Sequence, residues 1–166
     1  MLSRKEFLLK KSKGKRIVND KLLELRKILN ISLDLSCFIQ LEESLLEIDR
    51  FYESFSDAKQ TNRLISITFK KNEMLKVSDW LKKKLLNRVD SFVKIINKDS
   101  VYIGVFLLPT NVVKEKWIDL LSFDGDTLNV SLSDFNVMID LFDYEGCFYF
   151  ECNVWSLEEN HHLENE

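Results

Sequence analysis

The sequence predicts a single α+β domain whose mixed, mostly antiparallel sheet has five or six strands, with about four helices packed chiefly on one face. Three observations predict this fold class. The chain has 166 residues, a length that suits one domain around one hydrophobic core. Its 45% apolar and 31% charged residues are typical of a globular protein. Segments with apolar residues at helical spacing are interspersed with segments that alternate as strands do.

The first forty residues are expected to form an arm, a helix and a strand. Residues 1–18 hold many Lys and Arg and few apolar residues, so we interpret them as a basic arm. An Asn-Asp pair can then cap a helix over residues 20–29. Alternation over residues 31–41 favours a half-buried strand, although a helix from Asp34 onward remains an open alternative.

The middle of the chain is expected to alternate helices and strands. Apolar residues at helical spacing predict an amphipathic helix over residues 42–55, followed by a loop over residues 56–62. β-Branched residues predict a short strand over residues 64–69. Residues 78–97 show the clearest helical spacing, behind a Ser-Asp cap.

Beyond this helix, residues 101–108 are nearly all apolar, which is typical of a central strand covered on both sides. A helix is expected over residues 111–121. An Asp-Gly-Asp turn follows at residues 124–126, and three strands complete a C-terminal antiparallel meander. We place the folded domain at residues 19–157 and interpret residues 158–166 as a flexible acidic tail.

The last two strands suggest their own pairing. If Asp140 faces Tyr149 across a loop at residues 143–146, every inward position of the hairpin is apolar. A slip by one residue would turn that apolar set toward solvent, so the pattern favours this pairing. The expected inward pairs are Phe135 with Val154, Val137 with Cys152, Ile139 with Phe150, and Leu141 with Phe148. The first strand of the meander extends this face with Leu128, Val130 and Leu132.

Charge is distributed very unevenly along the chain. Residues 1–100 hold 22 Lys or Arg against 14 Asp or Glu, a net charge of +8, and residues 101–166 hold 2 against 13, a net charge of −11. No Lys or Arg follows Lys116. An imbalance of this size affects steering and the choice of partner more than it affects the fold.

The outward face of the hairpin combines aromatic and Met side chains with a rim of carboxylates, a composition that protein interfaces favour. The alternative is that a helix, for example the basic one near residues 21–27, packs on this face as part of the core. The candidate partner-binding residues are Asp124, Asp126, Asp134, Met138, Asp140, Phe142, Asp143, Glu145, Tyr149, Glu151 and Trp155.

No enzyme motif, cofactor motif or metal-ligand spacing accompanies this face, so we expect neither catalysis nor a cofactor nor a metal. The three cysteines, Cys37, Cys147 and Cys152, lack a nearby base and fit small core positions. No secretory signal and no membrane-spanning stretch is present, and the cysteine count is odd, which together predict a reducing cytoplasm.

A small α+β protein with an acidic, aromatic-bearing sheet and no catalytic apparatus resembles the immunity proteins of bacterial toxin systems, particularly those of contact-dependent growth inhibition. The resemblance implies that the protein stays in the cytoplasm and neutralises a cognate toxin domain. Such toxins are often nucleases, whose cationic groove an acidic sheet can occupy.

A nucleic-acid-binding or regulatory module is the alternative. Clustered Lys and Arg bind phosphates by releasing counterions, and the chain has such clusters in the arm and at Lys82 to Lys84. Solvated helix faces have the same composition, and Arg is scarce for reading bases. We therefore expect a protein partner in preference to a nucleic acid. The oligomeric state is left open.

Overall fold

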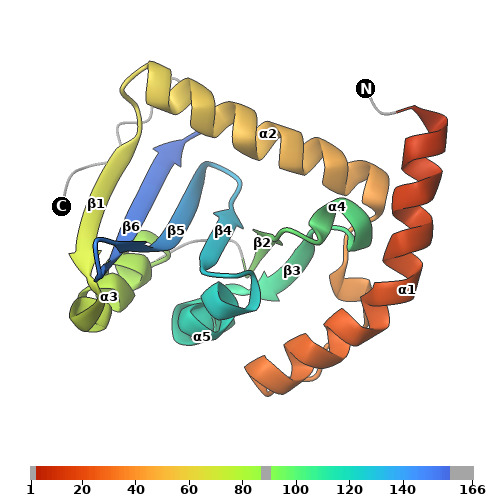
Figure 1. The fold of residues 1–166 in the computed structure, drawn as a ribbon, viewed down its shortest axis with the longest axis horizontal. Coiled ribbons are helices and arrows are strands. Elements are labelled where there is room, and N and C mark those ends of the chain that lie inside the picture. The colour runs from red at the N-terminus through yellow and green to blue at the C-terminus, as the bar shows by residue number, and fades with distance from the viewer. Residues whose placement is uncertain (1–2, 87–90, 158–166) are drawn as a thin grey trace.

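The computed structural model describes residues 3–86 and 91–157, and it has the α+β architecture that the sequence predicts. Figure 1 shows one sheet with helices around it. The helices are α1 (Arg4–Leu29), α2 (Leu41–Gln60), α3 (Met74–Lys84), α4 (Ser100–Ile103) and α5 (Thr110–Phe123). The strands are β1 (Ile65–Lys70), β2 (Phe92–Ile96), β3 (Phe106–Pro109), β4 (Thr127–Ser131), β5 (Phe135–Tyr144) and β6 (Cys147–Ser156). The expected tail at residues 158–166 lies outside the described residues.

The six strands form one sheet in the order β1-β6-β5-β4-β2-β3, and every described pairing is antiparallel. Alternate residues of each strand point to opposite faces. On one face, Val137 and Ile139 belong to a core with side chains from α3, α5 and the C-terminal part of α1. On the other face, Met138 belongs to a second core with side chains from α2. Three of the longer helices therefore cover the inner face and α2 alone crosses the outer one (Figure 1).

The basic N-terminal segment is a helix and not a separate arm, so the expected boundary at residue 19 is wrong. Helix α1 runs without interruption for 26 residues. It begins with a reciprocal cap, in which the Glu6 amide donates to Ser3 Oγ at 3.3 Å and the Ser3 amide donates to Glu6 Oε2 at 2.8 Å. Lys and Arg are good helix formers, so their clustering did not argue against helix.

Residues 31–41 do not form the expected strand. They hold a short 3₁₀ helix, Leu35–Cys37, and a single bridge between Phe38 and Phe106. The Asp34 carboxylate accepts a hydrogen bond from the Ser36 amide at 2.8 Å. A side chain that bonds nearby backbone competes with strand formation, which explains the difference.

Two segments in the middle of the chain also differ from expectation. Helix α2 continues through most of the expected loop at residues 56–62. The expected helix over residues 78–97 is instead helix α3 and strand β2, with residues 87–90 between them outside the described part. Strand β2 is rich in Val and Ile, and such residues at helical spacing suit either structure.

The expected central strand over residues 101–108 contains helix α4 and strand β3, and β3 lies at an edge of the sheet. Gly104 joins them with φ = 97°, a backbone conformation that favours glycine. Helices over residues 42–55 and 111–121 and the strand over residues 64–69 are present, as α2, α5 and β1.

The C-terminal hairpin keeps the expected faces but not the expected partners. Asp140 lies opposite Glu151 and Val137 opposite Val154, a shift of two residues from the predicted pairing. The loop has only two residues, Glu145 and Gly146, with φ of 50° and 76°. Such a turn suits the twist of a hairpin better than a four-residue loop does. Because the shift is even, the inward set stays inward.

Within residues 3–86 and 91–157, no helix combines the length and the apolar character needed to cross a membrane.

We predict that Gly14→Ala destabilises the protein. Gly14 is buried where α1 touches α4, and an added Cβ would lie 2.0 Å from the Tyr102 carbonyl oxygen. The free-energy cost of moving α1 away from α4 should exceed the gain from the higher helix propensity of Ala. We expect the free energy of unfolding to fall by about 1–2 kcal/mol. Urea unfolding measures this loss. The control is Ser12→Ala, at an exposed position of the same helix, which should change stability by no more than a few tenths of a kcal/mol.

Candidate partner-binding surface

Helix α2 covers one end of the outer sheet face and leaves the other end open. It is held by an ion pair of 2.8 Å between Glu47 and Lys94 Nζ, and by a hydrogen bond of 2.9 Å from Trp155 Nε1 to Ser54 Oγ. Figure 1 shows it crossing the sheet from β3 toward β1.

Two of the predicted partner-binding anchors lie beneath this helix. Trp155 is fully buried and Met138 is 8% exposed, so the prediction that they contact a partner is wrong. The rings of Phe51 and Phe55 each meet the Trp155 ring edge to face, with centroids 5.1 Å apart. An intramolecular cover was the alternative, but the covering helix is α2 and not the basic helix near residues 21–27.

Beyond α2, the hairpin of β5 and β6 presents two rows of side chains that are at least partly exposed. Asp140 lies opposite Glu151, and Phe142 lies opposite Tyr149 in the next row. The rings of Phe142 and Tyr149 are stacked with centroids 5.6 Å apart, and Phe142 remains 43% exposed. We call these four residues the open hairpin surface.

The two carboxylates of this surface repel each other. Like charges directly opposite in an antiparallel pair destabilise the sheet, because their Cβ atoms lie only about 5 Å apart. Partial burial raises the pKa of Asp140, and the charge of Glu151 adds to this effect, while a hydrogen bond from Thr127 opposes it. Within the described residues neither carboxylate forms an ion pair.

Buried asparagines line the boundary between the open surface and α2. Asn153 is 1% exposed, and its Nδ2 donates to Glu151 Oε1 at 3.0 Å. Among the residues that the structure describes, the Oδ1 atoms of Asn129, Asn136 and Asn153 have no hydrogen-bond partner. These three Asn occupy outward positions of β4, β5 and β6, as the period of two places them. Amide side chains at alternate positions of three neighbouring strands are the signal that the sequence analysis did not use.

The turn between α5 and β4 brings further carboxylates beside this surface. Asp124 accepts a hydrogen bond of 2.8 Å from the Lys98 amide, and burial raises its pKa to about 6. The Asp126 carbonyl accepts from the Leu141 amide at 2.9 Å, next to the open rows. Tyr52 of α2 faces the same region, since burial raises its pKa and the charges of Asp124 and Asp140 add to the rise.

The remaining predicted acids divide between the two ends of the hairpin. Asp143 and Glu145 are exposed at the turn that joins β5 to β6, close to Phe142. Asp134 precedes β5 at the opposite end, and a strand of that length spans roughly 30 Å. Asp134 therefore lies about one strand length from the open hairpin surface.

The basic helix reaches the Asp124 edge of this negative region, because the charge of Lys21, like that of Lys98, lowers the pKa of Asp124 against the larger effect of burial. Among the described ion pairs, this helix forms none with Asp140 or Glu151. Figure 1 shows α1 at the end of the molecule away from the β5–β6 hairpin. Lys21 of α1 pairs with Glu24 at 3.1 Å and with Asp99 at 3.2 Å. Among the described ion pairs, the sole one that reaches an acid beyond residue 116 joins Lys116 to Asp119 within α5.

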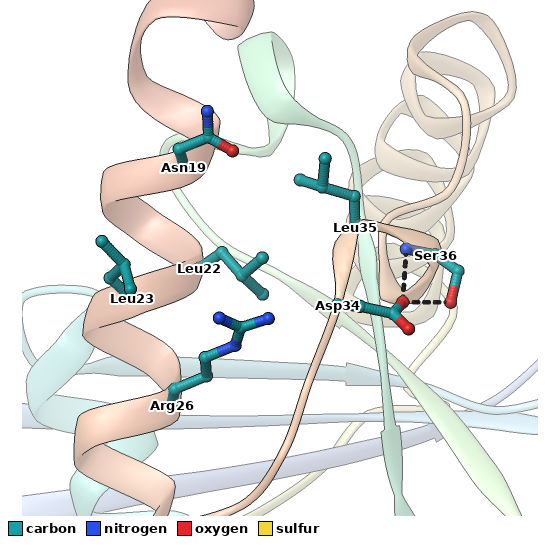
Figure 2. Close-up of a pocket in the computed structure, with 7 residues that line it drawn as sticks. All are labelled: Asn19, Leu22, Leu23, Arg26, Asp34, Leu35 and Ser36. Carbon is teal, nitrogen blue, oxygen red and sulfur yellow. Dashed lines mark hydrogen bonds between the residues drawn. The ribbon is translucent and has the colours of Figure 1, made fainter.

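A separate hollow of about 670 Å³ lies between α1 and the segment that follows it (Figure 2). Its lining residues are Asn19, Leu22, Leu23, Arg26, Asp34, Leu35 and Ser36. Figure 2 shows the Asp34 carboxylate turned to Ser36, and Arg26 Nε donates to the Leu33 carbonyl at 2.5 Å. Asp34 and Arg26 therefore bond atoms of the neighbouring chain segment.

Two of the three thiols are not activated, and the described residues form no metal site. Burial raises the pKa of Cys37 to about 11 and that of Cys152 to about 12, so neither is a thiolate at neutral pH. In the described ranges, no three His, Cys, Asp or Glu side chains are grouped closely enough to hold a metal ion. The His pair of the tail lies outside those ranges.

No protein-family model, curated protein or solved structure matches the chain.

We predict that Ser54→Ala loosens α2 from the sheet. The hydroxyl accepts hydrogen bonds from Trp155 Nε1 and, at 3.3 Å, from Asn136 Nδ2. Leaving the buried indole N–H unpaired should cost about 1–3 kcal/mol of unfolding free energy. Urea unfolding tests this, with Ser56→Ala at an exposed position of α2 as the control. Equal stabilities of the two variants would contradict the assigned role.

We predict that Asp124→Asn stabilises the protein at neutral pH but not in acid. The folded-state pKa of about 6 lies above the ordinary value of 3.8, so the folded protein binds the proton more tightly than the unfolded chain. The wild type therefore loses stability as pH rises through that interval. The free energy of unfolding of Asp124→Asn, relative to that of the wild type, should therefore increase from about pH 4 to pH 7. Urea unfolding at both pH values measures this difference.

The control is Asp143→Asn, which removes one exposed carboxylate of the same region. An advantage of Asp124→Asn that does not change with pH would contradict the raised pKa.

Proposed function

We propose that the protein is a non-enzymatic inhibitor of the immunity type, which binds a basic toxin domain, in particular a nuclease, in the cytoplasm of the producing cell. The observation that carries the proposal is the open hairpin surface. There, two opposed carboxylates and two stacked rings remain accessible, and no described cation pairs with either carboxylate.

The composition of this surface suits fast capture of a cationic protein. Complementary potentials accelerate encounter, and aromatic side chains supply affinity at short range once water is displaced. Phe142 and Tyr149 would act as the anchors, and Asp124, Asp126 and the hairpin turn would form the acidic rim. Protection against a lethal enzyme requires such a rapid association.

Helix α2 extends the negative region beyond the hairpin. It carries six Asp or Glu against one Arg and one Lys, a net charge of −4. Most of its apolar side chains face the sheet, and its charged residues are exposed, apart from Glu47, which pairs with Lys94 of β2. The proposed partner surface would therefore include the exposed side of α2, which the sequence alone did not suggest.

The nucleic-acid alternative is less well supported by the arrangement of the cations. Helix α1 and the Lys-rich end of α3 lie at opposite ends of the molecule (Figure 1), so they do not form one continuous phosphate-binding face. Some cations of α1 are also engaged, as in Lys13 Nζ, which lies 3.7 Å from the Tyr102 ring centroid.

The proposal predicts a complex with the product of the toxin gene that directly precedes this reading frame. Titration calorimetry should give a stoichiometric complex with a dissociation constant on the order of nanomolar, and stopped-flow association should slow steeply with added salt. A double variant, Asp143→Asn with Glu145→Gln, should reduce the association rate at low salt. The absence of a complex at micromolar concentrations and low salt would refute the proposal.

A matched variant of α1 distinguishes the alternative. Lys11, Lys15 and Arg16 are exposed, and changing all three to Gln removes positive charge without removing part of the fold. Toxin binding should be nearly unchanged in this variant. Salt-sensitive binding of DNA or RNA by the wild type that this variant loses would favour the nucleic-acid function instead.

A further inference from the structure

We infer that the open hairpin surface receives an arginine side chain of the partner, with the guanidinium held between Asp140 and Glu151 and its plane against the rings of Phe142 and Tyr149. This inference rests on the proposed function, since it names the group through which a basic partner is recognised.

The first support is that Asp140 and Glu151 present carboxylate oxygens to this position, where the Thr127 hydroxyl supplies one hydrogen bond to Asp140. Asp140 and Glu151 are cross-strand neighbours on the same face, and Thr68 and Thr127 are the residues that flank them in register on β1 and β4. Lys70 lies opposite Tyr149, but within the described residues it pairs with neither carboxylate. A single bound cation with several donors would remove the repulsion between the two acids.

The second support is the amide of Asn153, which fixes the position of the Glu151 carboxylate. This side chain is 1% exposed, and its Nδ2 donates to Glu151 Oε1 at 3.0 Å. A carboxylate that is already held in one position loses less conformational freedom when a partner binds.

The third support is the stacked ring pair, and it favours arginine over lysine. The Phe142 and Tyr149 rings adjoin the acid pair, and their planes differ by 30°. A planar guanidinium stacks on aromatic faces and presents five donors in a fork that fits carboxylates. An ammonium group has three donors and no plane. A divalent cation is less suitable, because no described group of three ligating side chains is present.

The experiment uses the full chain labelled with ¹⁵N and two probes of equal charge, N-acetyl-arginine methylamide and N-acetyl-lysine methylamide. We expect the arginine probe to shift the amide signals of residues 140, 151 and 153 and to bind several times more tightly than the lysine probe. Glu151→Gln should weaken arginine binding about tenfold, since it removes one charge-assisted hydrogen-bond partner.

Glu151→Gln is expected to fold, because Gln keeps an oxygen for Asn153 Nδ2 and relieves the repulsion from Asp140. Dispersion of the amide spectrum checks this directly. The matched control is Glu115→Gln, which removes one exposed charge from α5, outside the proposed binding surface. A second variant, Phe142→Ala, should reduce the preference for arginine over lysine without removing either carboxylate.

Equal affinity for the two probes, an equal loss in Glu115→Gln, or no shift at residues 140, 151 and 153 would each overturn the arginine site. None of these results would refute the proposed function, since a toxin complex depending on the diffuse negative field would persist. Conversely, a toxin that fails to bind while the arginine probe binds as expected would refute the function and leave the site intact.

Discussion

The seating of α2 on Trp155 is the contact on which the arrangement of the surface depends. The indole is buried beneath two phenylalanine rings and one serine hydroxyl of α2, and these contacts decide where the helix crosses the sheet. On the outer face, the end of β5 and β6 that holds Trp155 is covered by α2 and belongs to the core. The outer face toward the hairpin turn stays accessible, including the opposed carboxylates and the stacked rings.

The accessible end is not optimised for the stability of the isolated chain. Opposed carboxylates, a buried amide oxygen without a described donor and a raised pKa at Asp124 all cost free energy of folding. Such costs are expected where a surface is shaped for a partner that compensates them. At the opposite end of the molecule, Ser3 caps the N-terminus of α1, and Lys21 of α1 pairs with Asp99.

Much of the fold and part of the site followed from local pattern. The alternation over residues 135–156 gave the two faces of the hairpin correctly, and helical spacing located α2 and α5. Segments with Val and Ile at ambiguous spacing, such as Phe92–Ile96, were assigned to the wrong element because both structures bury the same residues. The pairing was two residues out because a two-residue turn and a four-residue loop preserve the same faces.

The sequence by itself determined the charge asymmetry, the α+β class and the set of outward side chains on the hairpin, since these depend only on composition and on a period of two. Tertiary structure alone decided which of those outward residues remain accessible. Met138 and Trp155 share a face with Phe142 and Tyr149, and no local rule separates them. Helix α2, which is distant in the chain, separates them. Its apolar side chains pack on Met138 and Trp155 at one end of the sheet and do not reach Phe142 and Tyr149.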